Sequence, residues 1–272
     1  MNKQGAILIK LIAGIFIVLV LSPRLQAQAP PQFVCLAFDG SSPNSFWQET
    51  RDFAESLSTQ NKPLRFTYFV SGVFFLTHQN RMIYQSPQMP AGQSNIGFAS
   101  NQKDISERIV QMNSSINEGH EIGSHLNGHF DAQLWTAQDW LREFSVFFSL
   151  LENVFENNQM PIEPKLFQAS HIQGFRAPYL SINNGLWPAL KKNNFRYDTS
   201  RTSRPGYWPE KIDGIWNFPL ARLKIAGTQR RTLSMDYNFY VAQSGAKEDS
   251  NNSQLYEEQM YQTYIEYFMG SY

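Results

Sequence analysis

Short apolar segments alternate along this chain with longer segments of helical periodicity. Apolar segments that suit strands occupy residues 33–38, 65–70, 121–124, 172–176, 195–199, 215–218 and 232–236. Helical patterns occupy residues 45–58, 103–118, 136–155 and 185–193. Strands separated by helices pair in parallel, because the crossover helix returns the chain to the same edge of the sheet. The alternation therefore predicts an α/β fold, with a parallel sheet or barrel whose site is built at the carboxyl ends of the strands.

Two of these helices carry start signals, and the chain ends in a further helical pattern. Ser45 with Gln48 three residues later, and Thr136 with Asp139, are each typical of a capped helix start. Residues 249–272 predict an amphipathic helix.

The first 27 residues predict a secretory signal peptide rather than part of the fold. Lys3 and Lys10 precede an uncharged apolar run at residues 11–21, and small residues follow up to Ala27. The alternative is an uncleaved membrane anchor, but this run is shorter than the roughly 20 residues that a spanning helix needs. We therefore expect cleavage after Ala27, a short linker at residues 28–32, one domain at residues 33–272 and an exported, periplasmic or secreted protein.

Charge and cysteine content narrow the possible partners. Lys plus Arg total 23 and Asp plus Glu total 23, so the chain offers no excess of positive charge to a nucleic acid backbone. Membrane contact is expected only through an uncleaved signal peptide, and no protein partner is inferred. Cys35 is the only cysteine, which excludes an intramolecular disulfide, and its apolar neighbours predict a buried strand residue.

Two histidines follow a predicted strand at a spacing that suits a metal. His125 and His129 are four residues apart, so on one helical turn both could reach the same ion. A zincin protease would have Glu directly after the first histidine, where this chain has Leu126. Asp39, at the end of another strand, is the candidate third ligand, and two imidazoles with one carboxylate suit catalytic zinc or a similar divalent cation.

Four segments resemble the motifs of one family in the family's own order. GHEIGSH at residues 119–125, with His129, resembles the second motif of the polysaccharide deacetylases, the NodB-homology group also called carbohydrate esterase family four. GFRAPY at residues 174–179 resembles the third motif. FDG at residues 38–40 and SMD at residues 234–236 resemble degenerate forms of the first and fourth.

The resemblance implies a distorted (β/α) barrel that uses a divalent metal, zinc being favoured, to remove N-acetyl groups from a glycan. The predicted export favours peptidoglycan over chitin or exopolysaccharide as that glycan. It implies that His125 and His129 bind the metal. Arg176 would orient a carboxylate, and Asp236 resembles its usual partner. The backbone N–H of Tyr179 would help to stabilise the oxyanion.

Two departures from the family pattern leave alternatives open. The family has adjacent aspartates, a general base and a metal ligand, where this chain has Asp39 and Gly40. Asp39 therefore serves as the base, as the ligand, or as a bridge between the two roles, and we favour the base or bridging role. The family also has a late histidine, whereas no histidine follows His171. Either the barrel is incomplete at the C-terminus, or another group supplies the acid, or the protein binds glycan without cleaving it.

Aromatic residues make up 14% of the chain, and some could stack on sugar rings. Trp208 is the first candidate, because residues 204–210 are polar and loop-like.

Overall fold

The computed structural model describes residues 32–40 and 42–270. The predicted signal peptide, and the predicted linker apart from Gln32, lie outside these residues. The described residues from Cys35 to Gly270 belong to one compact unit. Within this described part, no helix is both long enough and apolar enough to cross a membrane.

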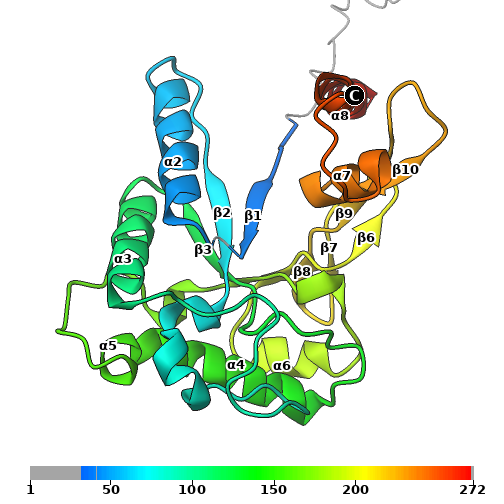
Figure 1. Ribbon diagram of the computed structural model, residues 1–272. Helices are drawn as coiled ribbons and strands as arrows, with labels where there is room; N and C mark the ends of the chain where they lie inside the picture. The colour runs from blue at the N-terminus through cyan, green and yellow to red at the C-terminus, as the bar shows by residue number, and fades with distance from the viewer. Residues whose placement is uncertain (1–31, 41, 271–272) are drawn as a thin grey trace, which may run out of the picture. The chain divides into compact units, whose positions relative to one another are not determined.

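A seven-stranded sheet in the order β1-β2-β3-β4-β5-β8-β7 forms the centre of this unit (Figure 1). Its strands are β1 (Leu36–Gly40), β2 (Phe66–Val70), β3 (Glu121–Ser124), β4 (Gly174–Phe175), β5 (Tyr197–Asp198), β8 (Ile215–Asn217) and β7 (Glu210–Ile212). All neighbouring pairs from β1 to β8 are parallel, and only β7 runs antiparallel to its neighbour. The predicted α/β class with a parallel sheet is confirmed.

The ladder of strand pairs has two edges, β1 and β7. Among the described residues no pairing joins them, so closure of the predicted barrel is not established. Because β1 pairs only with β2 in this part of the chain, Leu36 is 42% and Phe38 is 38% exposed. Cys35, just before β1, is also exposed, and its predicted burial is wrong. An apolar sequence fits a buried strand, but the residues here form an edge strand.

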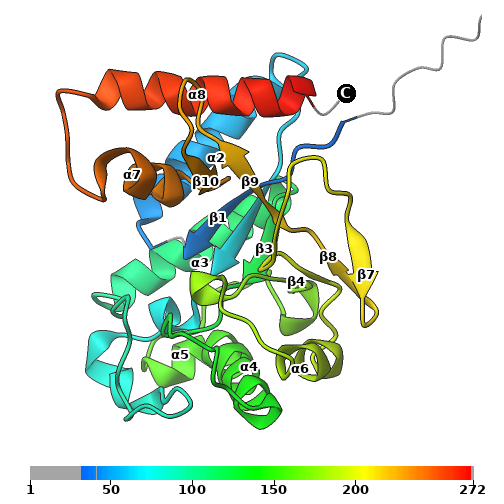
Figure 2. The ribbon, with the colours of Figure 1, turned by 90° about the vertical axis from the view of Figure 1, so that its right-hand side faces the viewer.

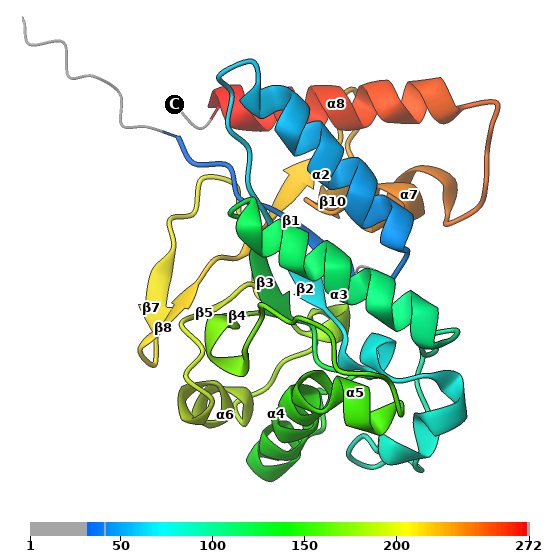
Figure 3. The ribbon, with the colours of Figure 1, turned by 90° about the vertical axis from the view of Figure 1, so that its left-hand side faces the viewer.

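Helices alternate with the strands along the chain and pack around the sheet. They are α2 (Asn44–Ser58), α3 (Gln102–Asn117), α4 (Ala137–Glu152), α5 (Val154–Asn157) and α6 (Leu186–Lys192), with 3₁₀ helices η1 (Gly72–Phe75), η2 (His78–Ile83), η3 (Ala169–His171) and η4 (Pro178–Leu180). Helices α2 and α3 pack side by side next to β1–β3, and α4 packs against α6 (Figure 3).

The two predicted helix caps have different outcomes. Thr136 and Asp139 form the predicted capping box at the start of α4, with each side chain bonded to the backbone of the other. The box predicted for Ser45 and Gln48 is wrong, because α2 already begins at Asn44. Pro43 precedes it with a φ of −75°, and no side chain caps this end. Proline fixes φ in the range that leads into a helix, so the helix starts directly after it.

Aromatic side chains between the sheet and α4 form the centre of the core. Phe144 is fully buried, with its ring centroid 5.1 Å from that of Phe175 on β4 and 4.8 Å from that of Phe195. Trp140, one helical turn earlier, stacks on Phe144 at 6.2 Å. Offset and edge-to-face packing of this kind stabilises a core beyond the area that it buries. It also fixes α4 against the strands that carry the predicted site.

A second, three-stranded sheet in the order β10-β9-β6 has a small apolar cluster of its own. Its strands are β6 (Thr202–Ser203), β9 (Leu220–Lys224) and β10 (Arg231–Leu233), and it is followed by α7 (Asp236–Ser244) and α8 (Ser253–Gly270). Helix α7 packs on β10 and α8 on β9 (Figure 2). Leu223 and Phe239 are buried there against Met260 and Tyr264 of α8. The helix predicted at residues 249–272 is therefore present as α8.

Replacing Phe144 with alanine tests whether the aromatic packing around α4 determines stability. We expect Phe144→Ala to lower the free energy of unfolding by about 3–5 kcal/mol, because a large cavity would open among rings that cannot collapse into it. Urea unfolding followed by circular dichroism measures the change. Phe53→Ala is the matched control, since Phe53 is 54% exposed on α2, and should cost under about 0.5 kcal/mol. Equal effects of the two substitutions would contradict this account of the core.

Candidate active site

The carboxyl ends of four parallel strands stand in register. Gly40 of β1 lies opposite Val70 of β2, Val70 lies opposite Ser124 of β3, and Ser124 lies opposite Phe175 of β4. The residues next to these positions therefore meet at one edge of the sheet. They include Asp39, His125 and Arg176, which come from three of the four motif-like segments.

Arg176 is held by bonds to one residue of β1 and to one residue directly after β5. Its Nη1 donates to Oδ1 of Asp39 at 2.8 Å, and its Nε donates to Oγ1 of Thr199 at 2.7 Å. The guanidinium lies over the ring of Phe69, 4.7 Å from the ring centroid. With only 6% of Arg176 exposed, this is an ordered, paired arginine rather than a solvated one.

His125 is buried behind Arg176 and hydrogen bonded to its backbone. Nδ1 of His125 lies 2.8 Å from the carbonyl oxygen of Arg176. Because a carbonyl oxygen can only accept, Nδ1 carries the proton and Nε2 keeps its lone pair. Burial lowers the pKa of His125, so the ring is neutral at neutral pH. This is the tautomer and the backbone support that metal-binding histidines usually have.

His129 lies next to His125 at the edge of the site. The two ring centroids are 5.1 Å apart, and the ring of Tyr179 stands edge-on to His129 at 4.6 Å. Burial, followed by the neighbouring His125, lowers the pKa of His129 to about 4. Two neutral imidazoles side by side fit the chemistry of a divalent cation, which binds unprotonated nitrogen.

The predicted third ligand does not join them. Within residues 32–40 and 42–270, no three or more His, Cys, Asp or Glu side chains come together as a group that could hold a metal ion. Oδ1 of Asp39 instead accepts from Arg176. The charge of Asp39 still acts on both histidines, where it opposes part of the lowering of their pKa values by burial. In this structure the donor set that fits a cation is therefore the histidine pair, with Asp39 beside it.

The other predicted site residues lie in different surroundings. Tyr179 belongs to the cluster through its ring contact with His129, and it has a left-handed φ of 54°. Trp208 is 71% exposed in the loop before β7, and no contact of its side chain with the cluster is found in the described part of the chain.

Asp236 is not the partner of Arg176, which pairs with Asp39 instead. Asp236 is exposed at the first turn of α7, where its Oδ1 accepts from the backbone N–H of Tyr237 at 2.7 Å. The sequence motif gave no sign that β10, which precedes Asp236, belongs to the second sheet rather than the main one.

Three polar residues that the sequence analysis did not single out support the loop of Arg176. Asp198, fully buried at the end of β5, accepts from the hydroxyl of Ser200 at 2.5 Å and from Asn217 at 3.2 Å. The same Ser200 hydroxyl oxygen accepts from the backbone N–H of Ala177 at 2.8 Å. The available signal was their position, since polar residues directly after a buried strand of a parallel sheet fall at the site edge.

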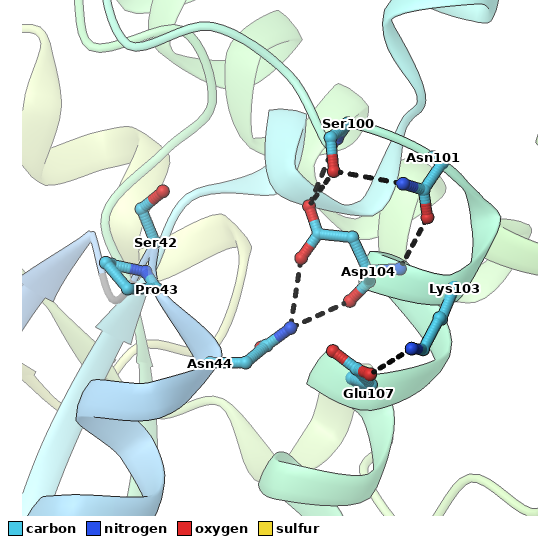
Figure 4. A pocket seen from close by; sticks show the side chains of 8 residues that line it. All are labelled: Ser42, Pro43, Asn44, Ser100, Asn101, Lys103, Asp104 and Glu107. Carbon is cyan, nitrogen blue, oxygen red and sulfur yellow. Dashed lines mark hydrogen bonds and ion pairs between the residues drawn. The ribbon is translucent and has the colours of Figure 1, made fainter.

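A polar pocket of about 470 Å³ opens where α2 and α3 begin (Figure 4). It is lined by Ser42, Pro43, Asn44, Ser100, Asn101, Lys103, Asp104 and Glu107. Asn44 donates to the backbone oxygen of Asp104 at 3.1 Å and to its carboxylate at 3.0 Å. None of the predicted site residues lines this pocket, although its lining residues Ser42, Pro43 and Asn44 follow β1 closely in the sequence.

Comparison with known proteins gives structural matches only. No protein-family model matches the chain, and no curated protein matches it. Among solved structures, the chain is similar to a family 4 carbohydrate esterase from Streptomyces lividans in complex with acetate (16% identity, 63% of this chain and 63% of that one, TM-score 0.36). It is similar to the chitin deacetylase of the fungal pathogen Colletotrichum lindemuthianum (19% identity, 62% and 56%, TM-score 0.38).

A third match is a pseudoenzyme of the same family from Bacillus anthracis, with 10% identity over 62% of this chain and 43% of that one, and a TM-score of 0.36. The chain is similar to carbohydrate esterases of family 4. It spans less than two thirds of the length of each of these three structures.

The pH dependence of stability tests the buried carboxylate beneath the Arg176 loop. Burial raises the pKa of Asp198 to about 6, above the value near 3.9 of an unfolded chain. Between these two values the folded state binds more protons than the unfolded state. The free energy of unfolding should therefore fall by about 1.4 kcal/mol per pH unit from this group as pH rises from about 4 to 6.

Asp198→Asn should remove that contribution from the slope, which urea unfolding at half-unit pH steps measures. Asp213→Asn is the control, because Asp213 lies in the exposed turn between β7 and β8, and its slope should match that of the unsubstituted protein. If the free energy of unfolding changes with pH equally in Asp198→Asn and in the unsubstituted protein, burial of the Asp198 carboxylate does not cause the pH dependence.

Proposed function

We propose that this chain is an exported hydrolase that removes N-acetyl groups from an N-acetylated glycan, with peptidoglycan favoured as the substrate. The observation that carries the proposal is the meeting of His125, His129, Asp39 and Arg176 at the carboxyl edge of one parallel sheet. The motif-like segments that resemble the polysaccharide deacetylases contribute these same residues. Export is proposed from the signal-like sequence of residues 1–27.

His125 and His129 would hold a divalent cation, with zinc favoured, through ring nitrogens that are unprotonated at neutral pH. The bond from Nδ1 of His125 to the carbonyl oxygen of Arg176 fixes the ring so that Nε2 is the free donor. When bound, such a cation supplies Lewis acidity that polarises a carbonyl group.

The remaining residues would handle the proton and the charge of the reaction. Asp39 is the carboxylate whose charge acts on both histidines, and it would accept the proton of the attacking water. Arg176 fixes the Asp39 carboxylate through a buried, charge-assisted hydrogen bond. The backbone N–H of Tyr179, whose ring contacts His129, would donate to the oxyanion that develops on the amide oxygen.

A glycan-binding protein without hydrolytic activity is the second candidate. It is favoured by the engagement of Asp39 with Arg176, together with the lack of a third converging ligand in the described part of the chain. On this alternative the protein would bind the same N-acetylated glycan at the same edge of the sheet. With either candidate function, the exposed side chain of Trp208 would offer a surface on which a sugar ring stacks.

Acetate release separates the two candidates. We expect the purified protein with added zinc to release acetate from N-acetylated peptidoglycan or chitin oligomers, and His125→Ala to lower the rate at least about 100-fold, because the cation would lose half of its protein donors. The control is His171→Ala. His171 is exposed in η3, which precedes the amino end of β4, whereas the site lies at the carboxyl ends of the strands. Its loss should therefore leave the rate unchanged.

A folded protein that binds these oligomers but releases no acetate would contradict the hydrolase and favour the binding protein. Equal losses of rate in His125→Ala and His171→Ala would contradict the assignment of the site.

Gly40 allows a direct test of the missing ligand. Gly40 has a left-handed φ of 71°. Apart from Gly40 itself and its two chain neighbours, no heavy atom of the described residues lies within 4 Å of the position that a Cβ would take. Aspartate tolerates this backbone region better than most residues, so Gly40→Asp adds a second carboxylate beside Asp39 at a modest cost. We expect zinc affinity, measured by isothermal titration calorimetry, to rise about tenfold or more.

Gly40→Asn is the matched control, since it introduces the same shape without the charge and should raise affinity much less. Equal affinities of Gly40→Asp and the unsubstituted protein would show that this position does not face the cation.

A further inference from the structure

The loop that carries both histidines is strained at two positions. Leu126 has a φ of 55° and His129 a φ of 58°, both in the left-handed region. For residues with a side chain, this conformation is unfavourable, because Cβ comes too close to the following carbonyl oxygen. Such residues persist only where the surrounding structure holds them in place. The contacts of this loop therefore determine where the ring of His129 lies.

A buried hydrogen-bond relay connects this loop to helix α4. The backbone N–H of Gly128 donates to the phenol oxygen of Tyr84 at 3.0 Å, and the Tyr84 hydroxyl donates to Oε1 of Glu143 at 2.8 Å. Tyr84 follows η2, and Glu143 lies on α4 with 1% of its surface exposed. The relay thus connects the residue before His129 to helix α4, whose Phe144 packs on Phe175 of the sheet.

The approach is so close that only glycine fits at residue 128. A Cβ there would lie 2.7 Å from the Tyr84 phenol oxygen and 2.8 Å from its ring. The same helix also holds the preceding residue, because Nδ2 of Asn127 donates to the backbone oxygen of Glu143 at 3.0 Å. From the other side, the Asn95 side chain donates to the backbone oxygen of His129 at 2.9 Å.

The protonation of the relay suits this arrangement. Burial and the adjacent Glu143 raise the pKa of Tyr84 above its usual range, so it keeps its proton and can donate. Burial also raises the pKa of Glu143 to about 7, while Asn127 and Tyr84 act in the opposite direction. A carboxyl oxygen accepts a hydrogen bond in either protonation state, so the bond from Tyr84 can persist on both sides of that pH.

We propose that Tyr84 and Glu143 are positioning residues for His129, acting through the backbone N–H of Gly128 to hold the left-handed turn that aims the imidazole into the site. The role of the ring as a metal donor rests on the proposed function, whereas the positioning itself does not. Neither residue contacts His125 or His129 by any interaction found within residues 32–40 and 42–270.

The test uses two disrupting variants of the full protein and one conservative variant. Tyr84→Phe removes the acceptor of Gly128, and Glu143→Met removes the acceptor of Tyr84 at similar volume. Glu143→Gln keeps an oxygen that can accept from Tyr84. The matched control is Tyr68→Phe, because Tyr68 is also buried, at 2% exposed, and its hydroxyl bonds to Thr50 at 2.8 Å on α2, outside the site.

Amide hydrogen exchange of Gly128 and the ring carbon–hydrogen NMR signals of His129 are measured without metal at one fixed pH. We expect Tyr84→Phe and Glu143→Met to speed Gly128 exchange at least about tenfold beyond any change in global unfolding, and to shift or broaden the His129 signals. Tyr68→Phe should change neither, and Glu143→Gln should keep the values of the unsubstituted protein within about threefold.

Unchanged Gly128 exchange and unchanged His129 signals in both disrupting variants would overturn the proposal. An equal effect of Tyr68→Phe would also overturn it, since the loss would then follow from general destabilisation. If one disrupting variant fails to fold, the other decides, because the two break the same relay at different bonds.

Zinc titration separates this proposal from the proposed function. If the unsubstituted protein binds zinc, Tyr84→Phe should weaken the affinity at least about tenfold, as for other residues that orient metal ligands, and Tyr68→Phe should not. An affinity unchanged in Tyr84→Phe would count against the relay. If the unsubstituted protein binds no zinc, the metal role of the histidines fails while the metal-free NMR comparison still decides the positioning role.

Discussion

Arg176 joins four strands at the one edge of the sheet where the candidate site lies. Its side chain bonds Asp39 on β1 and Thr199 after β5, its backbone oxygen accepts from His125 after β3, and its guanidinium covers Phe69 on β2. A buried guanidinium needs such partners, because an unpaired charge in the interior is costly. The bond that pairs the guanidinium fixes the Asp39 carboxylate, and the backbone carbonyl of the same residue fixes the ring of His125. One residue thus positions both groups, through its side chain and through its backbone.

The second histidine depends on a different support. His129 follows a left-handed turn whose backbone is held by Tyr84, Asn95 and the helix α4. Helix α4 is itself fixed by the packing of Phe144 against Phe175 of β4 and against Phe195, which precedes β5. The aromatic core is thus connected to the site through one helix and one hydrogen-bond relay. Packing energy and site geometry are coupled at α4, where Glu143 and Phe144 are adjacent.

Two properties of the site point in different chemical directions. Both histidines are neutral by virtue of their burial, which suits metal binding. Asp39, by contrast, is already engaged by Arg176, and Gly40 provides no second carboxylate. Asp39 is therefore the single carboxylate at a position where the polysaccharide deacetylases, which the motif-like segments resemble, have two. On the proposed function, hydrolysis would depend on what Asp39 can do while it is paired with Arg176.

The sequence by itself determined the alternation of strands and helices and the parallel sheet. It also determined the grouping of Asp39, His125 and Arg176, because each lies at or directly after the carboxyl end of a strand, and the carboxyl ends of parallel strands meet. Hydrophobic periodicity and capping boxes are local signals, so most elements could be predicted within a few residues. Only the tertiary structure decided the pairing of Arg176 with Asp39 rather than Asp236, the exposure of Cys35 next to an edge strand, and the relay through Tyr84 and Glu143. These depend on which distant segments become neighbours, and no local pattern of residues encodes that.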